Sequence, residues 1–121
     1  MRIRIAAFLP AALLVLALAA GCHSRHVEST VENRTGEPVQ LLEVDYPNAS
    51  FGKNSLDAGA DFRYRFQISG SGKIKVGYTS AAGRQIAIDG PELAEGQEGR
   101  LEIVLLPGGK ADFHAELSAP R

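Results

Sequence analysis

The stretch DFRYRFQI, residues 61–68, decides the fold class of this chain. Every second position is apolar, and charged or polar side chains fill the positions between Phe62, Tyr64, Phe66 and Ile68. Because successive side chains of a β-strand point to opposite faces, this alternation predicts a strand with one buried and one solvated face. We therefore expect residues 61–68 to belong to a sheet that covers a hydrophobic core on one side.

Similar alternating patterns recur along the chain between short runs of turn-forming residues. In the second of them the apolar parity changes between Leu41 and Leu42. This change predicts a β-bulge, because one extra residue exchanges the two faces of a strand. Pro107-Gly108-Gly109 predicts a tight hairpin, since glycine tolerates the positive φ that such turns need. Strands are therefore predicted at residues 27–32, 39–46, 61–68, 73–78, 85–89, 101–105 and 113–117.

About seven short strands without helical periodicity predict an all-β domain over residues 27–121. The natural packing is an antiparallel β-sandwich that resembles the immunoglobulin type in architecture, and a small closed β-barrel is the alternative. The Cys–Trp–Cys core of antibody domains is absent, because the chain has one cysteine and no tryptophan. No intrachain disulfide can form, so the domain depends on burial of apolar side chains.

The pattern Leu-x-x-Gly-x-acid occurs twice, beginning at Leu56 and at Leu93, and each copy precedes a predicted strand. We expect the leucine to fill one end of the sandwich and the glycine to turn the chain. In the segment Tyr46–Phe51, aromatic residues flank turn formers. For Phe51 we expect burial in the core.

The first 21 residues differ in composition from the rest of the chain. Met1–Arg4 carries two arginines, and the apolar stretch of residues 5–18 is interrupted by Pro10. Small residues then precede Cys22. This order of basic, apolar and small residues is typical of a secretory signal peptide. An uncleaved membrane helix and a free thiol at Cys22 after ordinary cleavage are the two alternatives.

The residues around the cleavage position resemble the lipobox of bacterial lipoproteins. The matching segment is Leu18, Ala19, Ala20, Gly21 and Cys22, although the family favours leucine where this chain has Ala19. The resemblance implies cleavage between Gly21 and Cys22 by signal peptidase II. It also implies a thioether-linked diacylglycerol on the Cys22 sulfur and a third acyl chain on its amine. Several acyl chains make such an anchor permanent, because each buried CH₂ contributes about 0.8 kcal/mol.

Residues 22–26 are expected to form a short lipidated tether. In the lipoproteins that this segment resembles, aspartate after the cysteine tends to retain the protein at the inner membrane of a Gram-negative host. His23 occupies that position here. The resemblance therefore favours the periplasmic side of the outer membrane. His23 and His26 with Cys22 do not predict a metal site, because an acylated sulfur cannot act as a thiolate ligand.

The sequence predicts no catalytic site, metal or cofactor. Four acids recur at every third position, which indicates a solvated acidic loop rather than a calcium loop: Asp89, Glu92, Glu95 and Glu98. His114 lies on the polar parity of its strand, so we expect it at the surface, without the partners that nucleophilic catalysis needs. Cleavage after Gly21 leaves 11 basic and 14 acidic side chains. Such a chain has no clustered basic charge for nucleic acid.

Basic residues on two consecutive predicted strands permit one further hypothesis. Arg63 and Arg65, with Lys73 and Lys75, would form a basic stripe if the strands were neighbours on one wet face. The favoured interpretation is that they keep the sheet soluble. We therefore predict a lipid-anchored cell-envelope protein that acts as an accessory or protein-interaction module on an envelope partner of unknown identity. The alternative is a small-ligand or metal-ion binding lipoprotein. A deep pocket with convergent polar groups would favour the alternative.

Overall fold

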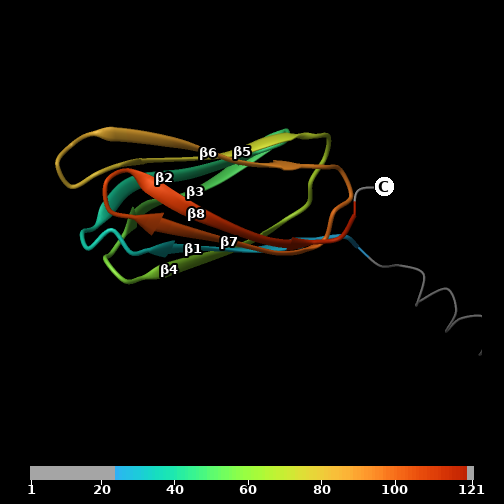
Figure 1. Cartoon of the computed structure of the whole chain (residues 1–121), viewed down its shortest axis with the longest axis horizontal. Coiled ribbons are helices and arrows are strands. Elements are labelled where there is room, and N and C mark those ends of the chain that lie inside the picture. The colour runs from blue at the N-terminus through green and yellow to red at the C-terminus, as the bar shows by residue number, and fades with distance from the viewer. Residues whose placement is uncertain (1–23, 120–121) are drawn as a thin grey trace, which may run out of the picture.

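The computed structural model describes residues 24–119, and every regular element in that range is a β-strand. The strands form two four-stranded sheets, with orders β4-β1-β7-β8 and β3-β2-β5-β6, that lie face to face (Figure 1). The predicted all-β sandwich is confirmed, and the closed barrel is wrong because each sheet keeps two edge strands. The strands are β1 (Val27–Asn33), β2 (Val39–Tyr46), β3 (Ala49–Leu56), β4 (Asp61–Phe66), β5 (Gly72–Thr79), β6 (Gln85–Leu93), β7 (Gly99–Leu106) and β8 (Lys110–Leu117).

The described chain has eight strands where the sequence predicts about seven. The missed strand is β3, which pairs with β2 around the two-residue connection Pro47-Asn48. All pairings are antiparallel except that of β1 with β7, which is parallel. The predicted antiparallel arrangement therefore has one exception, because β1 and β7 run in the same direction, with Val27 beside Gly99 and Asn33 beside Leu105.

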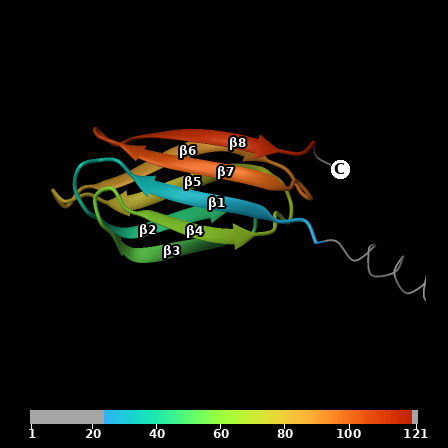
Figure 2. The ribbon, with the colours of Figure 1, turned by 90° about the horizontal axis from the view of Figure 1, so that it is seen from below.

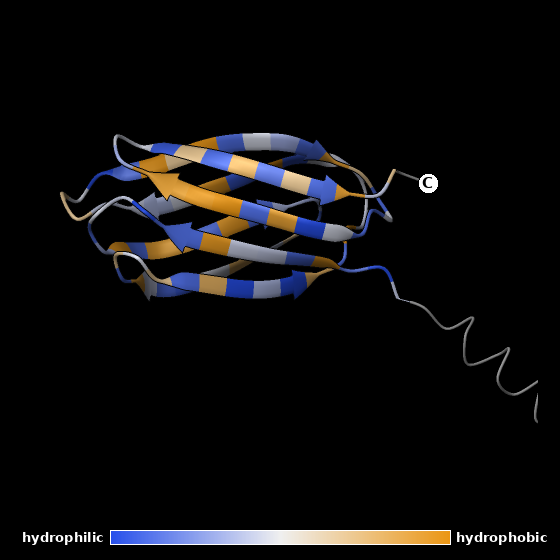
Figure 3. Ribbon diagram, turned by 60° about the horizontal axis from the view of Figure 1, so that its bottom comes forward, coloured by the Kyte–Doolittle hydropathy of each residue, from blue (hydrophilic) through white to orange (hydrophobic). Residues whose placement is uncertain are grey.

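The core lies between the sheets and is made by the inward parity of both. The strand alternation is visible as bands of apolar and polar residues (Figure 3). Burial of each large apolar side chain stabilises the fold by about 1.5–3 kcal/mol. Within residues 24–119, all strands and all core side chains lie between residues 27 and 117. A chain that begins after Cys22 therefore retains every core side chain of the described range. The largest fully buried apolar side chains are Leu56, Ile74, Leu93, Leu101, Ile103 and Leu105.

Strand β4 departs from the predicted burial of its apolar face. Phe66 is buried and so is Ile68, which lies just after the strand. Phe62 is only half-buried, and Tyr64 is 40% exposed. The reason is that β4 is an edge strand, so the opposite sheet covers only part of its inner face. Tyr64 is covered instead by Phe51 of β3, with ring centroids 4.4 Å apart and the rings stacked.

The two ends of the sandwich carry different connections. The first end, which we call the N-terminal end, holds residues 24–26 and the connections β2–β3, β4–β5 and β6–β7. The opposite, distal end holds the connections β1–β2, β3–β4, β5–β6 and β7–β8 (Figures 1 and 2). Both leucines of the repeated Leu-x-x-Gly pattern are buried as predicted, Leu56 at the distal end and Leu93 at the N-terminal end. Each is followed by a glycine with φ near +78°.

Candidate functional site

The predicted lipid-attachment residue lies outside the described residues. The same holds for the remaining lipobox positions, Leu18, Ala19, Ala20 and Gly21. The part of the predicted tether that is described contacts the domain. The His26 ring nitrogens lie 3.2 Å from Arg65 Nη2 and 3.3 Å from Gln67 Nε2. Arg25 donates a hydrogen bond to the Gly96 carbonyl at 3.3 Å. The chain therefore packs against the N-terminal end of the sandwich from Arg25 onward, a few residues after Cys22.

The acidic residues singled out in the sequence do not converge. Asp89 lies in β6, 3.9 Å from the Lys75 ammonium. Glu95 accepts a hydrogen bond from the Gly70 backbone, and Glu98 lies 3.8 Å from Arg25. Within residues 24–119, no group of three or more His, Cys, Asp or Glu side chains could hold a metal ion. Several of these acids thus serve local contacts. His114 is exposed on β8, as predicted.

The hypothesis of a basic stripe is wrong. Arg63 and Arg65 lie on β4 in one sheet, whereas Lys73 and Lys75 lie on β5 in the other. The consecutive strands cross from sheet to sheet, so the two pairs occupy opposite outer faces. Arg65 lies 3.2 Å from Glu28 of the neighbouring strand β1. Exposed ion pairs of this kind are worth about 0–1 kcal/mol.

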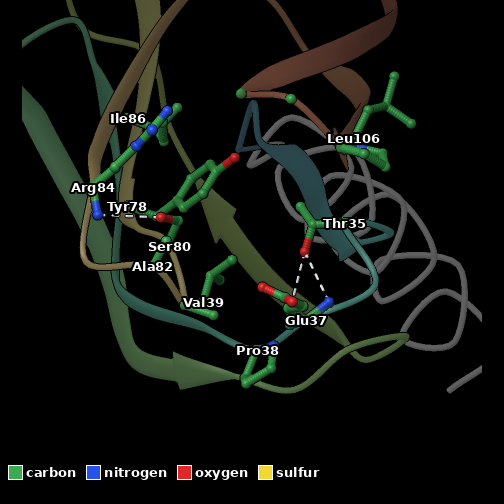
Figure 4. A pocket seen from close by; sticks show the side chains of 14 residues that line it. Thr35, Glu37, Pro38, Val39, Tyr78, Ser80, Ala82, Arg84, Ile86 and Leu106 are labelled. Atoms are coloured by element: carbon green, nitrogen blue, oxygen red, sulfur yellow. Dashed lines mark hydrogen bonds between the residues drawn. The ribbon is translucent and has the colours of Figure 1, made fainter.

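A pocket of about 310 Å³ opens at the distal end, and it is the candidate functional site (Figure 4). It lies between the β1–β2, β5–β6 and β7–β8 connections, which are far apart in the sequence. Val39, Ile86 and Leu106 contribute apolar side chains, and polar groups come from the connections themselves. This volume is at the lower end of the range of about 300–1,000 Å³ found for small-molecule sites, and the pocket is open to solvent on one side.

Asn33 holds the β1–β2 wall of this pocket in place. Its side chain is fully buried at the end of β1 and donates to the backbone carbonyls of Glu37, Leu56 and Asp57 at 2.8–3.2 Å. The Asn33 carboxamide oxygen accepts hydrogen bonds from the backbone N–H and the hydroxyl group of Thr35. The acceptance from the N–H two residues on is an Asx-turn, which fixes the direction of the connection.

Tyr78 forms the floor of the pocket. Its side chain is 5% exposed, and its hydroxyl group has no hydrogen-bond partner within residues 24–119. In Figure 4 the ring extends from the β5 backbone into the space between the labelled residues. Burial raises the pKa of this phenol, because the charged phenolate would lose its hydration. The hydroxyl group is therefore a neutral donor and acceptor that faces the pocket.

Two charged side chains line the mouth of the pocket. The Arg84 guanidinium group makes no ion pair or hydrogen bond with any part of the described chain, while the Arg84 backbone N–H donates to Ser80 Oγ at 3.2 Å. Glu37 lies in the β1–β2 connection, and its carboxylate is also without a partner in the described range. Figure 4 shows Arg84 beside Ile86, apart from Glu37.

The side chains that line the pocket include no nucleophile paired with a general base. Its lining contains no histidine or cysteine. The Thr35 hydroxyl group bonds to Asn33 Oδ1, and Ser80 Oγ accepts the Arg84 backbone N–H. Neither hydroxyl is paired with a general base, which activation of such a nucleophile requires.

The sequence did not reveal this pocket. Tyr78 ends the strand predicted at residues 73–78 and is buried, so its position in the sequence indicates a core residue rather than a site. Only the sheet order brings three connections together around the end of β5. The unusual feature that a sequence could offer is a single arginine in the Ala-Ala-Gly-Arg turn of residues 81–84, which is too common to indicate a site.

Comparisons with known proteins support the fold alone. No protein-family model and no curated protein sequence matches the chain. Within residues 24–119 there is no helix of the length and apolarity needed to cross a bilayer. The NMR structure of a protein from Eubacterium rectale is similar, with a TM-score of 0.55 and 15% sequence identity. The similarity covers 77% of this chain and 90% of that chain. Because the identity is so low, this similarity shows a shared fold and nothing about function.

Proposed function

We propose that the protein is a lipid-anchored component of the cell envelope whose β-sandwich acts as an accessory or interaction module. The signal-like N-terminus with Cys22 supports the anchor. The observation that carries the proposal is the separation of the two ends. The described chain begins at the N-terminal end, and the pocket and four connections lie at the distal end (Figure 1).

The anchor and the sandwich together define an orientation. Four residues lie between Cys22 and Val27, and the five extended steps between their Cα atoms reach about 17 Å at most. Eight-residue strands span about 27 Å. The distal connections therefore extend away from a membrane that holds Cys22, where a partner can reach them. Binding loops grouped at one end of a rigid sandwich are a common arrangement.

The anchor is tested by membrane fractionation and intact-mass measurement of the full chain with and without Cys22→Ala. We expect the unaltered protein in the membrane fraction with the mass of two or three acyl chains. The variant is expected to keep residues 1–21 and lose the lipid mass. Ser24→Ala, which retains the cysteine, is the matched control and should behave as the unaltered chain. Recovery of the mature protein with an unmodified Cys22 thiol would overturn the proposal.

A second candidate function is binding of a small organic molecule, and the distal pocket is the observation that favours it. The pocket combines apolar walls with the Tyr78 hydroxyl group and the Arg84 guanidinium group. Organic ligand sites are built in this way, from apolar surface and a few polar groups that fix orientation. A metal-ion version of this function has no support from the side chains that line the pocket.

A further inference from the structure

We infer that the distal pocket binds a small organic monoanion, a carboxylate attached to one compact apolar group. The inference rests on the second candidate function and deepens it by naming the chemical class of the ligand, whereas the accessory module requires only that the distal end be accessible. It rests on the shape of the pocket, on the unpartnered Tyr78 hydroxyl group and on the charges at its mouth.

The walls select the apolar part of the ligand. Pro38 precedes β2 and Val39 begins it on one side of the pocket. Ile86 lies in β6, and Leu106 and Pro107 lead into the β7–β8 turn. These side chains offer apolar surface from three directions within about 310 Å³. That volume admits a single ring or a branched chain rather than a polycyclic body.

The Tyr78 hydroxyl group selects a polar atom on the ligand. Tyr78 is 5% exposed, and its hydroxyl group lacks a partner among residues 24–119. The hydroxyl oxygen is open to the pocket rather than sealed in the core, because Glu32 Oε2 is the one polar side-chain atom of the described residues that is both buried and without a partner. A carboxylate oxygen in the pocket can therefore reach the hydroxyl group and accept its hydrogen bond. The phenol is protonated at neutral pH, since its ordinary pKa is about 10 and burial raises the pKa further.

The charge of the ligand follows from Arg84 and Glu37. Arg84 has a guanidinium group free of ion pairs within the described chain, and this group recognises planar carboxylates well. Glu37 brings a negative charge to another wall of the pocket and disfavours a dianion. A monoanion with its carboxylate toward Arg84 and its apolar group toward Leu106 satisfies both conditions.

Three probes of one shape test this inference: 3-phenylpropionate, 3-phenylpropanamide and 3-phenylpropylamine. They are titrated into isotope-labelled protein that begins at residue 23, which contains every strand and core side chain described. We expect 3-phenylpropionate to shift the backbone resonances of Tyr78, Arg84 and Ile86 saturably, with a dissociation constant of about 1 mM or below. The neutral amide should bind at least tenfold more weakly, and the amine should bind most weakly.

Two variants and a control assign the binding to the named groups. Tyr78→Phe keeps the ring and removes only the unpartnered hydroxyl group, so the fold is retained and affinity should fall about two- to tenfold. Arg84→Gln should reduce affinity for the anion about tenfold and abolish its advantage over the amide. Arg63→Gln removes an exposed charge from the outer face of the other sheet and should change nothing.

Equal or tighter binding of the amine, shifts that map elsewhere, or no saturable shift with any probe would each overturn the inference. These outcomes are independent of the membrane anchor, because the titration uses a chain without Cys22. A mature protein found without a lipid on Cys22 in the fractionation experiment would overturn the proposed function and would leave the pocket result unaffected.

Discussion

At the residue scale, Asn33 joins the β1–β2 connection to backbone that lies 23 and 24 residues further along the chain. Its side-chain amide donates to the carbonyls of Glu37, of Leu56 at the end of β3 and of Asp57 in the β3–β4 connection, and its oxygen accepts from Thr35. The Asn33 backbone N–H also donates to the Ala60 carbonyl, and its carbonyl accepts from Gly59. A buried polar residue so fully bonded specifies one arrangement of the distal end, because any shift leaves buried polar groups unsatisfied.

Replacement of this side chain should be costly. We expect Asn33→Ala to lower the free energy of unfolding by about 2–4 kcal/mol, since several buried groups lose their partners at once. Asn54→Ala, at an exposed position in β3, is the matched control and should stay within about 0.5 kcal/mol of the unaltered domain. Urea unfolding followed by circular dichroism measures both. Equal midpoints for the two variants would contradict this role of Asn33.

Two tyrosines with raised pKa values are expected to make the free energy of unfolding depend on pH in alkali. Burial raises the pKa of Tyr46 and of Tyr78, and nearby Tyr64 raises that of Tyr46 further. Above the ordinary value of about 10, the unfolded chain loses these protons while the folded chain keeps them. The folded state then binds more protons, so the free energy of unfolding falls as pH rises.

We therefore expect this contribution to be constant below pH 9 and to decline above about pH 10. Phenolate absorbance near 295 nm, followed against pH in the folded domain, should show a late-titrating component. Tyr78→Phe should remove part of it and reduce the decline in stability. A tyrosine titration that is complete at the same pH in folded and urea-unfolded protein would contradict the predicted shifts.

At the scale of elements, the β-bulge of β2 couples two neighbouring strands. The pairing with β5 shifts by one residue between Gln40 and Glu43, as the sequence predicts near Leu41 and Leu42. Leu41 has a φ of +51° and is 66% exposed. This left-handed conformation costs about 1–2 kcal/mol for a residue other than glycine. The bulge also brings the Leu42 carbonyl against Gly52 of β3, where an added Cβ would lie 2.5 Å from the oxygen.

Two glycine substitutions can distinguish the effect of the close contact between Gly52 and the Leu42 carbonyl from the general effect of replacing a glycine in a strand. Gly52→Ala should destabilise the domain by about 1–3 kcal/mol, because the new methyl group meets backbone that cannot move freely. Gly77→Ala on the adjacent strand β5 should be neutral or slightly stabilising, since its Cβ would meet only the Ile86 carbonyl at 3.5 Å. Thermal unfolding compares the two. A larger loss for Gly77→Ala would show that the bulge does not need Gly52.

The positions of β3 and β4 at the sheet edges explain why the sequence does not predict β3 as a strand. Five rings close this side of the sandwich, with Tyr46 and Phe66 4.2 Å apart between centroids and Phe51 stacked on Tyr64. Lys53 lies over the Phe62 ring at 5.4 Å. Side chains at such an edge are half in water, so the segment Ala49–Leu56 needs no regular alternation of apolar residues. It therefore resembles a loop in sequence although it forms a strand.

At the scale of the whole molecule, the proposed function gives the N-terminal end and the distal end separate roles. Arg25 and His26 contact the domain at the N-terminal end, so the proposed lipid on Cys22 would hold that end near the membrane. Residue 23 precedes these contacts and every strand. A substitution there can change recognition by the sorting machinery without changing the sandwich.

His23→Asp should therefore move the proposed lipoprotein from the outer to the inner membrane of a Gram-negative host, with an unchanged unfolding midpoint. The reason is the resemblance to lipoproteins in which aspartate after the cysteine favours retention. Density-gradient separation of the two membranes measures the distribution, and His23→Asn serves as the uncharged control. An identical distribution of the aspartate variant and the unaltered chain would contradict the predicted outer-membrane location.

The sequence by itself determined which segments are strands wherever a strand has one buried and one solvent-exposed face. Period-two alternation identified residues 73–78 and 101–105, and glycine chemistry identified the turn at Pro107–Gly109, because these signals are local. The burial of Phe51, Leu56 and Leu93 followed in the same way.

Only the tertiary structure decided which strands are neighbours, because pairing depends on contacts between residues far apart in the chain. It placed β4 and β5 in different sheets, which removed the basic stripe, and set β1 parallel to β7. It also gathered Thr35, Tyr78 and Arg84 around one pocket from three separate segments. No local pattern predicts that these three residues lie together, because each of them fits its own strand or turn whichever strands are neighbours in the sheets.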